Sequence, residues 1–214
     1  MLPLLNDVEV RVLGCLVEKQ ITTPEYYPLT LNAVTNACNQ KSNRDPVLQL
    51  DDVTVQIALD SLREKSLAAV ITGAGIRTPK YRHYFKEKLQ LSDEQVAVLC
   101  ELMLRGPQTP GELRSRGERM YPFENLAQVE TVLQEFCQQE PPLVIQLPRL
   151  SGQKELRYVH LLGGMPDISK WSESAPVSEN EKGRWETLEK RVALLEQNLA
   201  ELSRSFYEWK KQFE

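Results

Sequence analysis

The chain has 214 residues, of which 41% are hydrophobic and 26% charged, and its formal net charge is −4. This length fits one large or two small globular domains with buried cores. The acidic balance disfavours proteins that package nucleic acid, and no apolar run reaches the roughly 18 residues of a membrane span. We expect a cytoplasmic protein, since the N-terminus lacks the basic start and apolar core of a signal peptide.

Three helices are predicted in the first 65 residues. The first has Asn6 as its N-cap and Glu9 three residues later, which together form a capping box. The second begins at Thr30, because a proline two residues earlier keeps the chain extended and a threonine can cap free amides. The third begins at Asp51 or Asp52. Its apolar positions at helical spacing are Val55, Ala58, Leu59 and Leu62.

A β-hairpin is predicted after the third helix. An apolar strand at 68–71 leads to a glycine-rich turn at 73–75, and the chain returns through 80–85. Three helices followed by a hairpin are the elements of a winged helix-turn-helix domain.

The same order of elements is predicted a second time. Two helices start with capping boxes at Ser92–Gln95 and Thr109–Glu112, and a third helix precedes a hairpin from 143–145 to 157–160. Three landmarks recur between the halves: Thr23-Pro24 with Thr109-Pro110, Val70-Ile71 with Val144-Ile145, and Tyr81-x-His83 with Tyr158-x-His160. We therefore predict a mainly α fold with small β-hairpin wings (α+β), built as two tandem winged helix-turn-helix domains.

The predicted domains are 1–90 and 91–164, followed by a flexible linker at 165–181 and a coiled-coil helix at 182–214. The linker is rich in Pro, Gly and Ser. In the last segment, large apolar residues alternate at steps of three and four, as in a coiled coil: Trp185, Leu188, Val192, Leu195, Leu199, Leu202, Phe206, Trp209 and Phe213. We expect a parallel homodimer. A trimer, a foreign partner helix and folding back onto the chain's own domains are the alternatives.

Motifs for catalysis or metal binding are not recognised in the sequence. The turn at 73–75 is followed by a strand, so it lacks the helix N-terminus of a phosphate-binding loop. His83 and His160 occupy equivalent positions in two hairpins, which favours a structural role over pH sensing or ligation. The cysteines are far apart and are expected to be buried apolar residues: Cys15, Cys38, Cys100 and Cys137. We expect a non-enzymatic protein without a cofactor.

Positive charge is concentrated on the first predicted wing. Between 77 and 88 there are five basic residues and one acidic residue. The third helix of each half is a poor candidate for entering DNA, because neither offers the lysines and arginines that supply affinity for a polyanion. The exposed positions of these helices are Thr54, Gln56, Asp60, Arg63 and Glu64, then Gln128, Glu130, Thr131, Gln134 and Glu135. If DNA binds, we expect Arg77, Lys80 and Arg82 to contact its backbone, and Lys41, Asn43 and Arg44 to read bases.

Four asparagines share one helical face, at steps of four, three and four: Asn32, Asn36, Asn39 and Asn43. Asparagine is a mediocre helix former, so this face needs a reason. Either the amides hydrogen-bond the loop at 44–50, or they form a polar docking face that reads adenine or binds a partner's backbone.

Three sequence segments are unusual enough to identify a family: Asn36-Ala37-Cys38-Asn39-Gln40-Lys41-Ser42-Asn43-Arg44-Asp45-Pro46, Lys80-Tyr81-Arg82-His83, and Arg105-Gly106-Pro107-Gln108-Thr109-Pro110-Gly111-Glu112-Leu113-Arg114. With them the chain resembles the YceH-like family of bacterial proteins, from the N-terminus to about Gly164. The resemblance implies a tandem winged-helix fold. It implies no activity and no site residues.

Two functional classes follow. The acidic balance, the acidic third helices and the heptad segment favour a protein-interaction or assembly module in the bacterial cytoplasm. The alternative is a DNA-binding transcriptional regulator that contacts DNA through the first wing and the 41–44 corner. Neither involves a membrane or a small-molecule substrate.

Overall fold

The computed structural model describes residues 4–73, 77–149 and 155–166. The chain divides into two compact units, 1–173 and 174–214, and all described residues belong to the first. Residues 167–214, which hold most of the predicted linker (165–181) and all of the predicted coiled-coil helix (182–214), lie outside the described residues, so both stay predictions.

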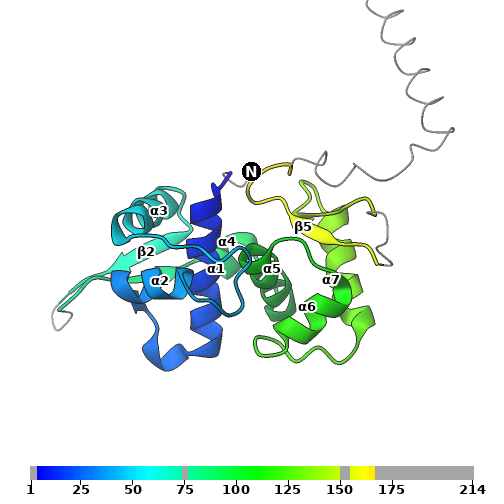
Figure 1. The fold of residues 1–214 in the computed structure, drawn as a ribbon, viewed down its shortest axis with the longest axis horizontal. Coiled ribbons are helices and arrows are strands. Elements are labelled where there is room, and N and C mark those ends of the chain that lie inside the picture. Colours follow the sequence, from blue (N-terminus) through cyan, green and yellow to red (C-terminus); the bar gives the residue numbers. More distant parts are fainter. Residues whose placement is uncertain (1–3, 74–76, 150–154, 167–214) are drawn as a thin grey trace, which may run out of the picture. The chain divides into compact units, whose positions relative to one another are not determined.

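The first half of the unit is mostly helical (Figure 1). Its elements are α1 (Asp7–Thr22), the 3-10 turn η1 (Pro24–Tyr26), β1 (Leu29–Thr30), α2 (Leu31–Cys38), α3 (Asp52–Glu64), β2 (Ala68–Ile71), β3 (Lys80–His83) and α4 (Phe85–Leu89). The predicted starts are confirmed: Asn6 and Glu9 form a capping box, Thr30 accepts a hydrogen bond from the Ala33 amide at 3.3 Å, and Asp51 caps α3.

The first hairpin belongs to a three-stranded antiparallel sheet in the order β1-β3-β2, and it projects from the body of the unit (Figure 1). Along β3, Tyr81 and His83 are buried while Lys80 and Arg82 are partly exposed, which is the alternation of a half-buried strand. Two details correct the prediction. The short strand β1 was not expected, and the return strand ends at His83 because α4 begins at Phe85.

The second half repeats the order of three helices and a hairpin. Its elements are α5 (Asp93–Arg105), α6 (Pro110–Gly117), α7 (Leu126–Gln138), β4 (Val144–Gln146) and β5 (Tyr158–His160). The capping boxes that start α5 and α6 are confirmed. The predicted mainly α fold with small antiparallel hairpins is therefore confirmed.

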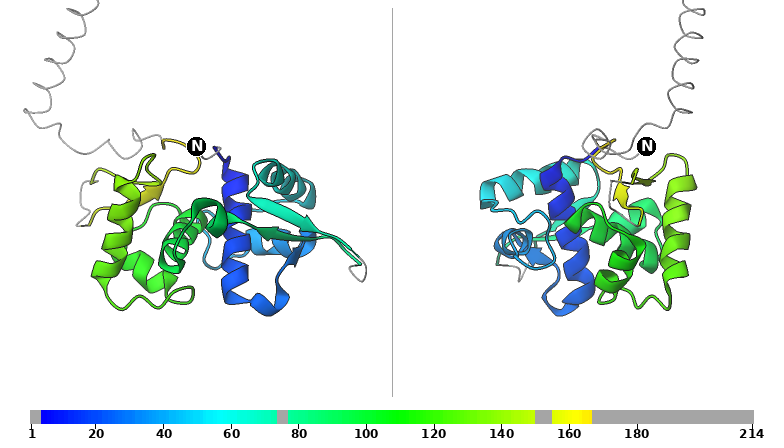
Figure 2. Two further views of the ribbon diagram at one scale, coloured as in Figure 1. Left: turned by 180° about the vertical axis from the view of Figure 1, so that it is seen from behind. Right: turned by 45° about the vertical axis from the view of Figure 1, so that its right-hand side comes forward.

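Helices α1 and α5 lie side by side where the two halves meet (Figure 2). A Cβ at Gly14 would lie 2.9 Å from Leu104 Cδ2, so any larger residue would require Leu104 or the helices to shift. The Cys100 thiol donates to the Gly14 carbonyl at 3.4 Å. Buried residues of both halves form one continuous core, and the domain boundary near residue 90 stays a prediction.

Candidate functional site

Arg44, which was predicted to read DNA bases, is an interior residue. It is 4% exposed, and its Nη2 lies 2.6 Å from Glu18 Oε2. Burial alone would raise the pKa of Glu18, but the hydrogen bonds and charge of Arg44, with the charges of Lys19 and Arg119, outweigh it and bring that pKa to about 2. A guanidinium that pairs with a buried carboxylate is not available to a base edge, so the predicted role of Arg44 is corrected to that of a structural ion pair.

Asn43 connects this ion pair to the second half. Its amide nitrogen donates to Glu18 and to Glu101, both at 3.2 Å, and its oxygen accepts from Arg105 at 3.1 Å. Burial raises the pKa of Glu101, and its Oε2 has no hydrogen-bond partner within the described part of the chain. Asn43 is thus also corrected from a base reader to a connector between α1 and α5. Of the predicted readers, Lys41 is exposed.

The four asparagines do not share one role: one hydrogen-bonds the loop at 44–50, and others lie at the surface. Asn39 holds the loop before α3: its Nδ2 donates to the Leu50 carbonyl at 2.8 Å and its Oδ1 accepts from the Leu50 amide at 2.7 Å. The loop-fixing role is therefore confirmed for Asn39. Asn36 is exposed and donates to the neighbouring Asn32 at 3.0 Å, so it stays a surface residue.

The three basic wing residues lie at the surface. Arg77 is exposed, and Lys80 and Arg82 occupy the outward positions of β3. The Arg82 guanidinium lies over the Tyr84 ring, 4.8 Å from its centroid, in a cation–π contact. The structure brings these three residues together on one hairpin.

Both histidines are placed as structural residues. The His83 Nδ1 accepts from the Phe85 amide at 3.1 Å, and its ring lies edge-on to the Tyr27 ring, at 6.1 Å between centroids. Burial lowers the pKa of His83 and of His160 to about 4, which keeps both rings neutral near pH 7.

Neither a metal centre nor a membrane span is found in the ranges that the structure covers. Across 4–73, 77–149 and 155–166, no three His, Cys, Asp or Glu side chains are grouped to hold an ion. No helix in those ranges is long and apolar enough to cross a membrane. Cys15, Cys38 and Cys100 are buried as predicted, and Cys137 is half-buried. The nine predicted coiled-coil residues, from Trp185 to Phe213, lie outside those ranges.

Two large apolar side chains stand on the outer surface of α3. Val53 is 68% exposed and Ile57 is 65% exposed, and they lie one helical turn apart. Beside them, a groove of about 450 Å³ runs between α3 and the N-terminal turn of α1. It is lined by Asn6, Asp7, Val8, Glu9, Thr54, Ile57, Ala58 and Ser61. We call Val53, Ile57 and this groove the α3 face; Figure 1 shows α1 and α3 adjacent there.

The α3 face has an acidic rim. Asp51 and Asp52 stand at the start of α3, and hydrogen bonds from Thr54 lower the pKa of Asp51. The basic side chains near the other end of α3 are neutralised, because Arg63 pairs with Asp60 and Lys65 pairs with Glu9, each at 2.6 Å. Within the described residues, Asp7, Asp51 and Asp52 belong to no ion pair.

Sequence reasoning missed Val53 and Ile57, although a signal was present. Helix α3 carries more apolar residues than one buried stripe uses: Val55, Ala58, Leu59 and Leu62 face the core, which leaves a valine and an isoleucine unassigned. The two apolar residues that the buried stripe does not use are the ones that the fold exposes.

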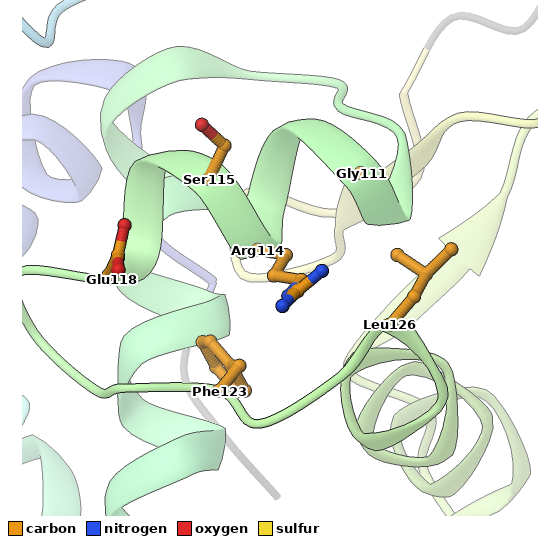
Figure 3. Close-up of a pocket in the computed structure, with 6 residues that line it drawn as sticks. All are labelled: Gly111, Arg114, Ser115, Glu118, Phe123 and Leu126. Carbon is orange, nitrogen blue, oxygen red and sulfur yellow. The ribbon is translucent and has the colours of Figure 1, made fainter.

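The second half has its own pocket, of about 390 Å³, between α6 and the segment before α7. In Figure 3, Arg114 reaches from α6 toward that segment, where its Nη2 donates to the Glu124 carbonyl at 3.2 Å. Arg114 and Glu118 give the pocket both signs of charge, and Phe123 and Leu126 give it apolar surface. This mixture favours no single class of ligand.

Comparison with known proteins identifies the family. A family model described as "Protein of unknown function, DUF480" matches residues 5–153. A UPF0502 protein of Geotalea uraniireducens is 56% identical over 98% of both chains. The chain belongs to this family. The predicted resemblance to YceH-like proteins, which are UPF0502 proteins, is thereby confirmed.

Other UPF0502 relatives cover similar lengths. One from Geobacter sulfurreducens is 53% identical over 99% of both chains. Another, from Opitutus terrae, is 57% identical over 82% of this chain and 76% of its own. The match to the Geotalea uraniireducens protein and the match to the Geobacter sulfurreducens protein both extend beyond residue 166 into the C-terminal segment.

Proposed function

We propose that this UPF0502 protein is a non-enzymatic binding protein whose two halves are tandem winged helices, and whose α3 face docks a protein partner. The repeated order of three helices and an antiparallel hairpin supports the winged-helix assignment. In that architecture α3 takes the place of the recognition helix.

The exposed apolar pair on α3 carries this proposal. A helix that enters DNA needs lysines and arginines for the phosphates, whereas α3 presents Val53 and Ile57 beside Asp51 and Asp52. Burying a valine or isoleucine side chain contributes about 1.5–3 kcal/mol, which is the usual source of affinity between proteins. The α3 face therefore suits a protein surface better than a phosphate backbone.

The test is affinity purification of the full chain from its native host, with and without nuclease. We expect a copurifying protein that survives nuclease and is lost from Val53→Ser/Ile57→Ser. The matched control is Tyr26→Ser, because Tyr26 is 72% exposed and follows the opposite end of α1, a helix of about 24 Å. A partner retained by the α3 double variant would refute the assigned surface.

DNA binding through the wing is the second candidate, favoured by three basic residues of the first hairpin, the exposed Arg77 and the partly exposed Lys80 and Arg82. Three to five phosphate contacts predict a slope of log affinity against log salt of about −3 to −4. Fluorescence anisotropy with mixed duplex DNA at about 50 mM salt tests it, since charge reversal of all three residues must then abolish binding. No binding by the wild type at this salt removes the candidate.

Assembly through the C-terminal segment is a further part of the proposal, supported by the heptad spacing. Sedimentation of the full chain should show a dimer that Leu195→Asp/Leu199→Asp dissociates. The control places the same charges off the apolar stripe, in Ala193→Asp/Gln197→Asp. A wild-type monomer at tens of micromolar would contradict self-association.

A further inference from the structure

We infer that the occupant of the α3 face is a basic amphipathic helix of another protein. This inference rests on the proposed function and names the chemistry of its partner. It combines the walls of the groove, the spacing of its apolar side chains and the charge on its rim.

The walls of the groove favour a helix over an extended peptide. They are the N-terminal turn of α1 and the middle of α3, so both walls are helical and neither offers a free strand edge. A partner must therefore bring a backbone that is already hydrogen-bonded, as an α-helix does. Val53 and Ile57, at i and i+4, form a short ridge next to the groove that contains Val8. Apolar side chains at i, i+3 or i+4 and i+7 of an incoming helix would pack along it.

The rim favours a basic partner. Asp51 and Asp52 precede the ridge at the start of α3 and Asp7 lines the groove, whereas Arg63 pairs with Asp60 and Lys65 pairs with Glu9. Lysine or arginine flanking the partner's apolar stripe would meet unpaired carboxylates at this rim. An acidic helix, or a phosphate backbone, would be repelled by the same three charges.

The experiment is photo-crosslinking of the full chain in host cells, with benzoylphenylalanine in place of Ile57 and, as control, in place of Tyr26. Both positions are highly exposed, so their reaction with unrelated proteins should be similar. Mass spectrometry then identifies the peptide attached at position 57. We expect a helical segment of another protein with net positive charge, enriched at least tenfold over position 26.

Every other crosslinking result would refute the basic helix, the docking of a protein on the α3 face, or both. An acidic or extended peptide at position 57 refutes the basic helix and leaves protein docking standing. Attachment only to copies of this chain makes a second copy the occupant, and also refutes it. Attachment to DNA replaces the proposed function by its alternative. Equal yields at positions 57 and 26 refute both the inference and protein docking on this face.

A synthetic copy of the crosslinked peptide separates the apolar from the electrostatic contribution. Its Kd for the full chain should rise at least tenfold in Val53→Ser/Ile57→Ser at any salt concentration. In Asp51→Asn/Asp52→Asn it should rise severalfold at low salt and little at high salt, because screening removes the charge contribution. Asparagine retains the N-cap at position 51, so α3 keeps its start. A double amide variant that binds as the wild type does at low salt would refute the electrostatic role of the rim.

Discussion

Arg44 and Glu18 are both buried and paired with each other, so replacing either one alone lowers the stability of the fold. Removing the arginine leaves a carboxylate buried without its main partner, which typically destabilises a protein by about 3–5 kcal/mol. We expect Arg44→Met to lose stability in this range, measured by urea unfolding at pH 7. Lys41→Met removes an exposed charge from the same corner and should change stability by less than about 0.5 kcal/mol. Equal effects of the two variants would place Arg44 outside the core.

His83 makes the stability of the folded chain depend on pH. Burial lowers its pKa from 6.5 to about 4, so between these values the unfolded chain takes up a proton that the folded chain refuses. The contribution of His83 is therefore complete above about pH 6.5 and falls by about 3 kcal/mol toward pH 4. His160, whose pKa is also lowered to about 4, adds a decrease in the same range, in the wild type and in a His83 variant alike. Urea midpoints measured from pH 7 to 4.5 should decline less in His83→Gln. The Glu18 ion pair, with its pKa of about 2, weakens only below about pH 4.5 and does not interfere.

At this scale the sequence showed which residues are unusual but not what they contact. Asn43 and Arg44 were correctly singled out, yet their partners Glu18 and Glu101 lie 25 and 58 positions from Asn43. No local pattern reports such distances. From sequence alone, a charged residue in an irregular segment is predicted to be exposed, because its distant partner cannot be recognised.

Asn39 fixes the end of the segment between α2 and α3, at Leu50. Because Asn39 both donates to and accepts from Leu50, Asn39→Ala leaves two backbone groups without partners and should cost about 1–3 kcal/mol. Asn36→Ala removes a single exposed contact with Asn32 and should be nearly neutral. Thermal unfolding of the two variants measures the difference. If Asn36→Ala is the more damaging, the asparagine face has been assigned the wrong way round.

The packing of α1 on α5 depends on the absence of a side chain at Gly14. An added Cβ meets Leu104 Cδ2 at 2.9 Å and Met103 Cβ at 3.2 Å, so either the buried Leu104 side chain or the two helices must shift. Overpacking costs about 1–3 kcal/mol and exceeds the gain of up to about 1 kcal/mol that alanine brings to a helix. Gly14→Ala should thus unfold at lower denaturant, whereas Gly111→Ala, which meets nothing closer than 3.9 Å, should be neutral or stabilised. Stabilisation of both variants would contradict the close approach.

Elements with a strong local signal were predicted well. The starts of α1, α2, α3, α5 and α6 follow from capping residues that act within three positions. The strand β1 was missed because its two residues form no pattern, and they are strands only through pairing with β3. The exposed ridge on α3 was missed because burial was assigned to a single stripe.

For the whole molecule, the repeat of helices and hairpin was legible in the sequence, because the landmarks recur in order. How the halves meet was not, since the α1–α5 contact joins Gly14 to Cys100 and Leu104, about 90 positions away, and no local pattern indicates it. The same limit applies to function. Charge counts argued against DNA on α3, but the apolar ridge that favours a protein partner emerged only from exposure in the fold.

The most direct test of protein docking on the α3 face compares two variants in one nuclease-treated purification from the native host. One is Val53→Ser/Ile57→Ser; the other is Arg77→Glu/Lys80→Glu/Arg82→Glu. The copurifying protein is quantified against that of the wild type. We predict that it is lost from the α3 variant and retained by the wing variant. Retention by the α3 variant with loss from the wing variant would contradict the account and assign binding to the basic hairpin.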